Sequence, residues 1–171
     1  MSAGVSSGVF FFTREGEFFA ELYRRLAASN VLGAPVPDAM LLEVSRLATF
    51  AASLETCSTD ELMRMWNLYS VQSLRAMLVS LGIDAAGFVS HATRCGIDID
   101  EPVTWPWQDE RVRRFLDDGT VKATLEGHLR QRREALLAYL DAAGVPTSGG
   151  SMEIADIGWR GTIQDNLAHL L

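Results

Sequence analysis

Three apolar segments of the chain are each followed by a polar turn and then by residues with helical spacing. These segments cover residues 8–13, 39–45 and 152–157, and they have the length and composition of buried strands. Strands that alternate with helices along a chain pair in parallel, because each helix carries the chain back to the edge of the sheet where the strand began. We therefore expect an α/β fold with a small, mostly parallel sheet of strand–loop–helix units.

Between the second and third units lies a long segment with helical patterns and capping signals. The predicted helices cover residues 58–81, 85–95, 109–118 and 120–143. Residues 98–108 contain two prolines and two tryptophans and are expected to form an irregular loop. We predict a single α/β domain over residues 1–171, in which residues 55–147 form a helical insertion that acts as a cap or lid.

A parallel sheet of three strands is small, because both of its faces must be covered. The sequence leaves three explanations open: further strands that the pattern does not reveal, completion of the fold by another chain, or completion by residues beyond Leu171. The last predicted helix, which begins near Ile163, is short. This short helix favours the interpretation that the chain is a fragment of a larger protein.

The composition argues against several classes of function. A net charge of −7 does not suit a broad nucleic-acid surface, and no apolar run has the roughly 20 residues that span a bilayer. The N-terminus lacks the basic segment of a signal peptide, so we expect a cytoplasmic protein. Cys57 and Cys95 have the setting of small core residues and lack CxxC spacing, and the histidines lack metal-ligand spacing. We predict no metal site, and the sequence identifies no cofactor.

Polar residues follow the carboxyl end of each predicted strand. They are Arg14 and Glu15 after the first strand, Ser45 and Arg46 after the second, and the segment from Asp156 to Thr162 after the third. Ligands of open α/β sheets bind at this edge, so we expect Arg14, Arg46 and Arg160 to converge. Guanidinium groups match phosphate oxygens, which predicts a site for a phosphate or sugar phosphate. By contrast, Arg64 and Arg75 on the predicted helices need no role beyond solubility.

Each residue of the third turn also has a structural interpretation. Asp156 either holds a ligand hydroxyl, a cation or an arginine, or it only caps the next helix; in a catalytic protein it is the expected acid or base of a group transfer. Gly158 and Gly161 either allow a tight turn or let backbone amides approach an anion. Thr162 is a candidate N-cap, and Trp159 stacks on a ligand or packs against the lid or a neighbouring domain.

The segments TREGE (residues 13–17), SR (45–46) and DIGWRGTIQ (156–164) resemble, in the same order, a region of large bacterial predicted hydrolases of the haloacid dehalogenase (HAD-like) superfamily. Those proteins are associated with surface-polysaccharide and glycosyltransferase gene clusters, and in them the region follows a phosphatase-like domain. The resemblance covers essentially the whole chain, and DIGWRGTIQ is its most specific part. It implies site positions at Arg14, Glu15, Gly16, Ser45, Arg46, Asp156, Gly158, Trp159, Gly161, Thr162 and Gln164.

The same resemblance has a negative implication. The catalytic DxD strand of the haloacid dehalogenase superfamily has no counterpart in this sequence, because the predicted strand that ends at Thr13 carries no aspartate nucleophile. Hydrolase activity is therefore not carried over to this chain. What the resemblance implies is membership of the accessory region.

Three functional hypotheses follow from these observations. The leading one is a module of a cytoplasmic surface-polysaccharide biosynthesis protein that binds phosphate, a sugar phosphate or a nucleotide-sugar, with or without group transfer. The alternative is a non-catalytic domain that docks a glycosyltransferase or phosphatase partner and uses its arginines for structure. A looser similarity of EIADIGWRGTI to the second loop of type I phosphoribosyltransferases gives a third hypothesis, although that loop has two acidic residues where this chain has one.

Overall fold

Strand β1 (Gly8–Phe12) is the central strand of a three-stranded parallel sheet with the order β2-β1-β5. In the computed structural model, Phe10 lies opposite Met40 of β2 (Asp38–Leu42) and Ile154 of β5 (Glu153–Ala155). The structure describes residues 8–13, 15–29, 31, 33–156 and 160–171. The predicted α/β fold class and the parallel direction of the predicted strands are confirmed.

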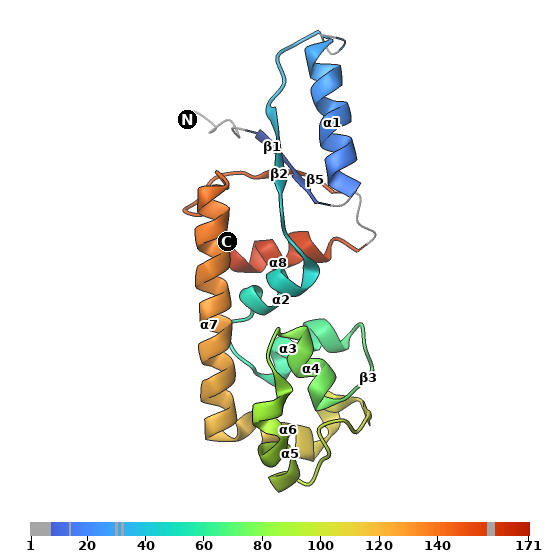
Figure 1. Cartoon of the computed structure of the whole chain (residues 1–171), viewed down its shortest axis with the longest axis vertical. Helices are drawn as coiled ribbons and strands as arrows, with labels where there is room; N and C mark the ends of the chain where they lie inside the picture. The colour runs from blue at the N-terminus through green and yellow to red at the C-terminus, as the bar shows by residue number, and fades with distance from the viewer. Residues whose placement is uncertain (1–7, 14, 30, 32, 157–159) are drawn as a thin grey trace.

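The described helices fall into two groups joined by one long helix. The three strands, α1 (Glu15–Ala28), α2 (Arg46–Ser53) and α8 (Thr162–Leu170) form what we call the sheet lobe. The helical lobe, residues 59–117, contains α3 (Thr59–Trp66), β3 (Val71–Gln72), α4 (Leu74–Ser80), η1 (Ala85–Phe88), α5 (Val89–Arg94), β4 (Val103–Thr104), η2 (Pro106–Gln108) and α6 (Glu110–Asp117). Helix α7 (Gly119–Ala142) runs along both lobes (Figure 1).

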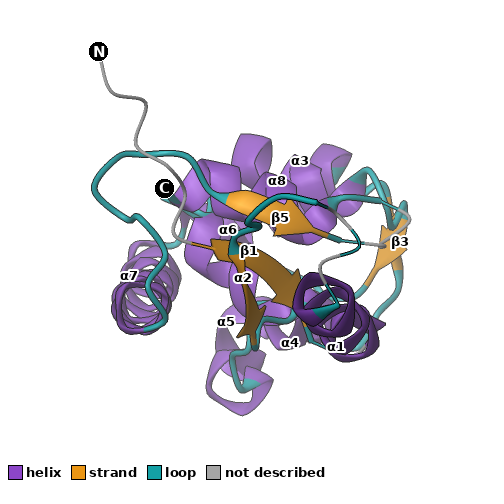
Figure 2. Ribbon diagram, turned by 90° about the horizontal axis from the view of Figure 1, so that it is seen from above, coloured by secondary structure: helices purple, strands orange, loops and turns teal. Residues whose placement is uncertain are grey.

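Different helices cover the two faces of β1. Phe11 packs against the ring of Tyr23 on α1, with the ring centroids 5.6 Å apart. Gly16 allows the first turn of α1 to lie close to the backbone of β1, since a Cβ at this position would lie 3.2 Å from the carbonyl carbon of Phe11. Phe10 and Phe12 belong to the core on the opposite face, which α7 and α8 complete. The alternation of strand side chains therefore assigns different helices to each face, and Figure 2 shows α1 and α7 on different sides of the strands.

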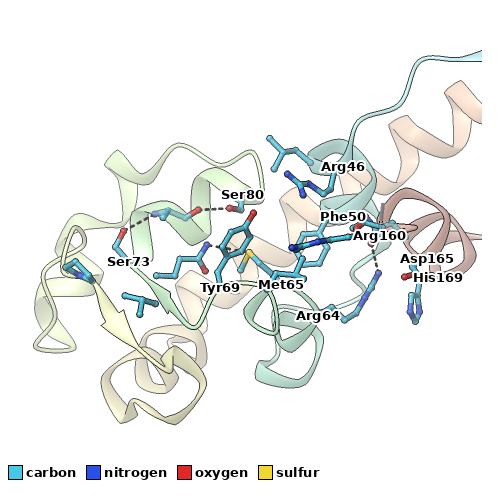
Figure 3. Close-up of a pocket in the computed structure, with 18 of the residues that line it drawn as sticks. Arg46, Phe50, Arg64, Met65, Tyr69, Ser73, Ser80, Arg160, Asp165 and His169 are labelled. Atoms are coloured by element: carbon cyan, nitrogen blue, oxygen red, sulfur yellow. Dashed lines mark hydrogen bonds between the residues drawn. The ribbon is translucent and has the colours of Figure 1, made fainter. Parts of the chain in front are cut away.

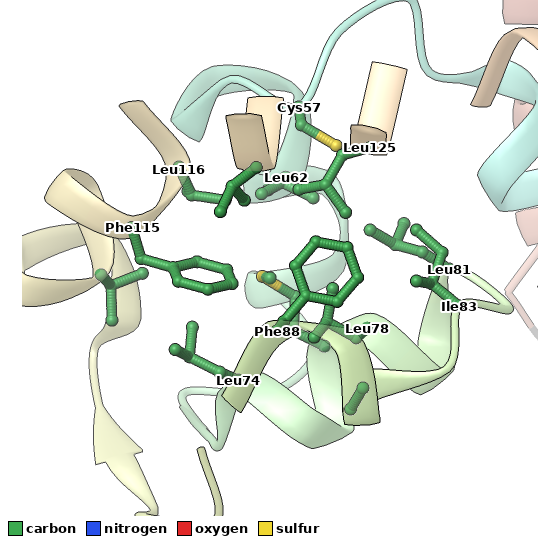
Figure 4. Close-up of a cluster of buried hydrophobic side chains, with 14 of the residues drawn as sticks. Cys57, Leu62, Leu74, Leu78, Leu81, Ile83, Phe88, Phe115, Leu116 and Leu125 are labelled. Carbon is green, nitrogen blue, oxygen red and sulfur yellow. The ribbon is translucent and has the colours of Figure 1, made fainter. Parts of the chain in front are cut away.

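The helical lobe has its own hydrophobic core (Figure 4). The side chains of Leu78, Phe115 and Leu125 are fully buried in it, and the rings of Phe88 and Phe115 meet at 6.2 Å. Cys57 is also buried in this core, as the sequence predicted for a small core residue. Burial raises the pKa of its thiol to about 12, and Glu126 and Glu61 add to the shift. Cys57 is therefore held in its protonated thiol form at neutral pH.

Helix α7 contributes to both cores. Its Leu125 and Leu129 belong to the core of the helical lobe, whereas Leu140 belongs to the core beneath the sheet. Tyr139 accepts a hydrogen bond from the backbone N–H of Glu43 at 2.7 Å, which fixes the end of α7 to the segment after β2. One helix thus supplies apolar side chains to the cores of both lobes and fixes the position of one lobe relative to the other.

The prediction of a single helix over residues 58–81 is wrong. Helix α3 ends at Trp66, and Ser73 begins α4 by accepting a hydrogen bond from the N–H of Ala76 at 3.1 Å. Between them, β3 pairs antiparallel with β4, so the predicted irregular loop over residues 98–108 contains a strand as well as η2. The indole N–H of Trp66 donates to Gln72 at 2.9 Å and secures the break. A contact between distant segments therefore overrides the continuous helical pattern.

A row of apolar side chains on α1 is exposed. Phe18, Leu22 and Leu26 follow each other at intervals of four residues, and 68%, 43% and 40% of their surfaces are accessible. Residues at this spacing share one face of a helix. This face of α1 therefore points away from the sheet and is not covered by the described part of the chain.

Loss of a buried leucine side chain from α7, in either of the two cores, is expected to destabilise both lobes together. Leu125→Ala and Leu140→Ala each remove a fully buried side chain, which should lower the free energy of unfolding by about 2–5 kcal/mol. Urea denaturation followed by both circular dichroism and tryptophan fluorescence should give one coincident transition for each variant. Val79→Ala, at an exposed position on α4, is the control and should change little. Two separated transitions would contradict the coupling of the two lobes through α7.

Asp118 is expected to stabilise the fold above about pH 4. The backbone N–H of Val121 donates to its carboxylate at 3.1 Å and holds its pKa below the ordinary value, and His91 and Arg94 act in the same direction. A lowered folded-state pKa contributes stability above the unfolded pKa, and this contribution is lost as the pH falls through the folded value. Asn also caps helices well, so Asp118→Asn mainly removes the charge.

The corresponding experiment compares urea midpoints of the wild type and Asp118→Asn between pH 6 and pH 2. The wild type should have the higher urea midpoint near pH 6. The difference in midpoint between the two proteins should shrink as the pH is lowered toward 2. Asp117→Asn is the matched control, because Asp117 is exposed and adjacent in sequence. A difference between wild type and Asp118→Asn that stays constant over this range would show that the charge contributes nothing.

Candidate functional site

A cavity of about 750 Å³ lies between the two lobes (Figure 3). Helices α2 and α8 form one side of it, and α3, β3 and α4 form most of the other. A volume of this size is typical of sites for small molecules, which range over about 300–1,000 Å³. The cavity is therefore large enough for a ligand the size of a nucleotide.

Two arginines on the sheet-lobe side of the cavity are free to bind an anion. Arg46 is the first residue of α2, and Arg160 precedes α8. Both side chains line the cavity and are exposed, and within the described part of the chain neither makes an ion pair or a side-chain hydrogen bond. An unpaired guanidinium offers up to five N–H donors in a planar fork, which matches the oxygens of a phosphate group.

A buried polar network joins the two sides of the cavity. Asn166 of α8 is only 2% exposed, and its amide donates to the hydroxyl of Thr49 on α2 at 3.1 Å. The carbonyl oxygen of the same amide accepts a hydrogen bond from Arg64 of α3 at 2.8 Å. Thr49 in turn donates to the backbone carbonyl of Ser45 at 2.9 Å. The network connects α2, α8 and α3, which belong to different lobes.

Arg64 has a structural role that the sequence analysis missed. Its guanidinium lies over the ring of Phe50 at 5.7 Å as well as bonding Asn166. Burial lowers the pKa of Arg64 below its ordinary value, and the carboxylates of Glu61 and Asp165 oppose the shift. The interpretation of Arg64 as a residue with no role beyond solubility is therefore wrong. Arg75, which the sequence also left without a role beyond solubility, forms a two-point ion pair with Asp100.

The helical-lobe side of the cavity is mainly apolar. Its lining includes the side chains of Met65, Leu68, Tyr69 and Val71, and about half of the surface of Tyr69 and of Val71 is exposed. This wall was not predicted, because Leu68, Tyr69 and Val71 lie where the predicted helix is interrupted. The cavity therefore has a basic side and an apolar side.

The residues predicted for the site are found in several places. Arg46, Arg160 and Thr162 line the cavity, whereas Glu15, Gly16, Ser45, Asp156, Gly161 and Gln164 are not among its described lining residues. Ser45 is the N-cap of α2 and accepts a hydrogen bond from the N–H of Ala48 at 3.2 Å. Glu15 is exposed at the start of α1, and Asp156 is half-buried just beyond β5. Arg14, Gly158 and Trp159 lie outside the described residues.

The N-terminus of α8 differs from the prediction in one respect. Gly161 is its N-cap, with φ of 59°, so Thr162 is the first helical residue rather than the cap. A Cβ at position 161 would lie 2.7 Å from Oε1 of Gln164, and the positive φ also favours glycine. Gly161 itself has no side chain that could cap the helix. The first N–H groups of α8 lie at the same end of the helix as Arg160.

The described residues give no indication of a metal site or of a membrane-spanning helix. No group of three or more His, Cys, Asp or Glu residues among them is placed to hold a metal ion. None of the described helices combines the length and the apolar character needed to cross a membrane.

A scan against models of known protein families finds no match for this chain, and no curated protein shows a significant match to it. The resemblance to the region associated with haloacid dehalogenases therefore stays a prediction.

The Arg64–Asn166 hydrogen bond is expected to contribute to the stability of both lobes. Asn166→Ala should lower the free energy of unfolding by about 1–3 kcal/mol, because it leaves buried groups without partners. A double-mutant cycle with Arg64→Ala should give a coupling energy of about 0.5–3 kcal/mol. Urea denaturation measures all four corners, and Asn67→Ala serves as the control because Asn67 is exposed. Additive effects of the two substitutions would refute the coupling.

Proposed function

We propose that the protein binds a phosphorylated small molecule or a nucleotide-sugar in the cavity between its lobes. The observation that supports this proposal is the pair of unpaired arginines, Arg46 and Arg160, on one wall of a cavity of about 750 Å³. Thr162 at the N-terminus of α8 lies on the same wall. Its hydroxyl and the positive end of the helix dipole favour an anion at this position.

The charges around the cavity favour one anionic group rather than several. Arg46, Arg64 and Arg160 line it together with Asp100 and Asp165. Arg64 bonds Asn166 and Asp100 is paired with Arg75, which leaves Arg46 and Arg160 as the available cations. A charge-assisted hydrogen bond contributes about 1.5–3 kcal/mol. One such bond from each guanidinium therefore gives about 3–6 kcal/mol, which corresponds to a dissociation constant of roughly tens of micromolar to several millimolar.

Binding is a better-supported proposal than catalysis. Asp156, the residue predicted to act in group transfer, is not among the described residues that line the cavity. A binding module of a cytoplasmic protein in surface-polysaccharide biosynthesis, next to a phosphatase-like or glycosyltransferase domain, is the context that the sequence resemblance suggests. In this proposal the chain holds a phosphorylated intermediate, and the neighbouring domain carries out the chemistry.

Isothermal titration calorimetry of the whole chain with UDP-glucose, glucose 1-phosphate and inorganic phosphate tests the proposal. At least one of these probes should bind, and Arg46→Ala and Arg160→Ala should each weaken it about tenfold or more, since tenfold corresponds to about 1.4 kcal/mol. Arg130→Ala removes an exposed arginine of α7 outside this cavity and should leave the affinity unchanged. Equal affinity for all variants would place the site elsewhere.

The docking hypothesis makes the opposite prediction for the same titrations. It is supported by the exposed apolar row of Phe18, Leu22 and Leu26 on α1. If the domain only docks a partner, none of the three probes should bind to the folded wild-type chain. That result would overturn the proposed function and favour the docking role.

A further inference from the structure

We infer that the cavity takes a phosphate ester whose body presents an apolar or planar face, such as a nucleoside or an isoprenyl group, rather than a bare sugar phosphate. The inference rests on the proposed function and specifies the part of the ligand that the arginines do not contact. It follows from the difference between the two walls of the cavity.

The wall opposite the arginines offers apolar surface that is only partly covered. Leu68, Tyr69 and Val71 are 40%, 47% and 53% exposed, and all three line the cavity. Met65 and Pro102 also line the cavity. A ligand that covers these side chains gains the hydrophobic contribution of the buried area, and the Tyr69 ring can stack on a flat group.

Three polar side chains of the same wall already have partners within the helical lobe, whereas the Tyr69 hydroxyl makes no hydrogen bond to the described residues. Gln72 accepts from the indole of Trp66 at 2.9 Å, and Ser73 accepts from the N–H of Ala76 at 3.1 Å. Ser80 donates to the carbonyl of Ala76 at 2.8 Å. Sugar hydroxyls pressed against this wall would lose hydrogen bonds to water with little replacement, and that loss is unfavourable.

The two kinds of surface lie on different sides of the cavity. Figure 3 shows Tyr69 and Ser73 on the helical-lobe side and Arg46 on the sheet-lobe side. On the helical-lobe side, Asp100 is already paired with Arg75 and offers no hydrogen-bond donor to an anion. A ligand with one charged end and an apolar body therefore fits in a single orientation, with its phosphate toward α2 and α8.

The experiment compares three phosphate monoesters that carry the same head group: uridine 5′-monophosphate, geranyl phosphate and glucose 1-phosphate. Calorimetry on the whole chain should show at least tenfold tighter binding of one of the first two than of glucose 1-phosphate. Preference for uridine 5′-monophosphate identifies a nucleotide site, and preference for geranyl phosphate identifies an isoprenoid site. Glucose 1-phosphate binding as tightly as both would overturn the inference.

Variants of Tyr69 test whether the apolar wall causes the preference. Tyr69→Ala should reduce the preference for the tighter-binding ester over glucose 1-phosphate to less than threefold, while the affinity for glucose 1-phosphate stays within twofold of the wild-type value. Tyr69→Phe should keep the wild-type preference. Val71→Ser is a second variant on the same wall, and Val79→Ala is the control outside the cavity. A preference that survives both Tyr69→Ala and Val71→Ser overturns the inference.

These titrations separate this inference from the proposed function. If all three esters bind through Arg46 and Arg160 with equal affinity, the proposed function stands and only the assignment of the ligand body is wrong. If none of the three esters binds but UDP-glucose or inorganic phosphate does, the inference is wrong and the proposed function stands. If none of these probes binds to the folded chain, both are wrong.

Discussion

The buried side chain of Asn166 is the interaction on which the shape of the site depends. A primary amide that is 2% exposed has to be hydrogen-bonded, and it meets this requirement with one group from each side, Thr49 of α2 and Arg64 of α3. Because the two partners belong to different lobes, the amide fixes the distance between them. The cavity is therefore a consequence of a satisfied polar network and not only of a gap between helices.

Helix α7 supports the same arrangement from the other side of the molecule. Leu125 and Leu140 lie at separate levels of this helix and in separate cores, so the lobes cannot rotate freely without losing packing at one of them. A sheet of only three strands is sufficient in this setting, because α7 and α8 cover one face and α1 covers the other. The small size of the sheet, which the sequence left with three explanations, is thus offset by packing against helices.

The sequence predicts the elements that depend on local patterns and misses those that depend on distant contacts. The three apolar strands and the helices over residues 109–118 and 120–143 were predicted correctly because their period, caps and glycines are local signals. The break between Trp66 and Ser73 was missed because it is stabilised by pairing with β4, about thirty residues later. The same limit applies to the site: Arg46 follows a strand end and could be predicted, whereas Tyr69 and Asn166 belong to no motif.

The net charge of −7 and the basic wall of the cavity have a joint consequence for binding. An acidic protein repels anions at long range, so the arginines act on a ligand only within roughly the Debye length, which is about 8 Å at physiological ionic strength. Affinity then has to come from contacts inside the cavity: paired guanidinium–phosphate hydrogen bonds at one end and burial of apolar surface at the other. Selectivity follows from the burial of apolar surface, because any phosphate ester can form the guanidinium–phosphate hydrogen bonds. This division of roles explains why an apolar wall opposite two free arginines is the feature that distinguishes one phosphorylated ligand from another.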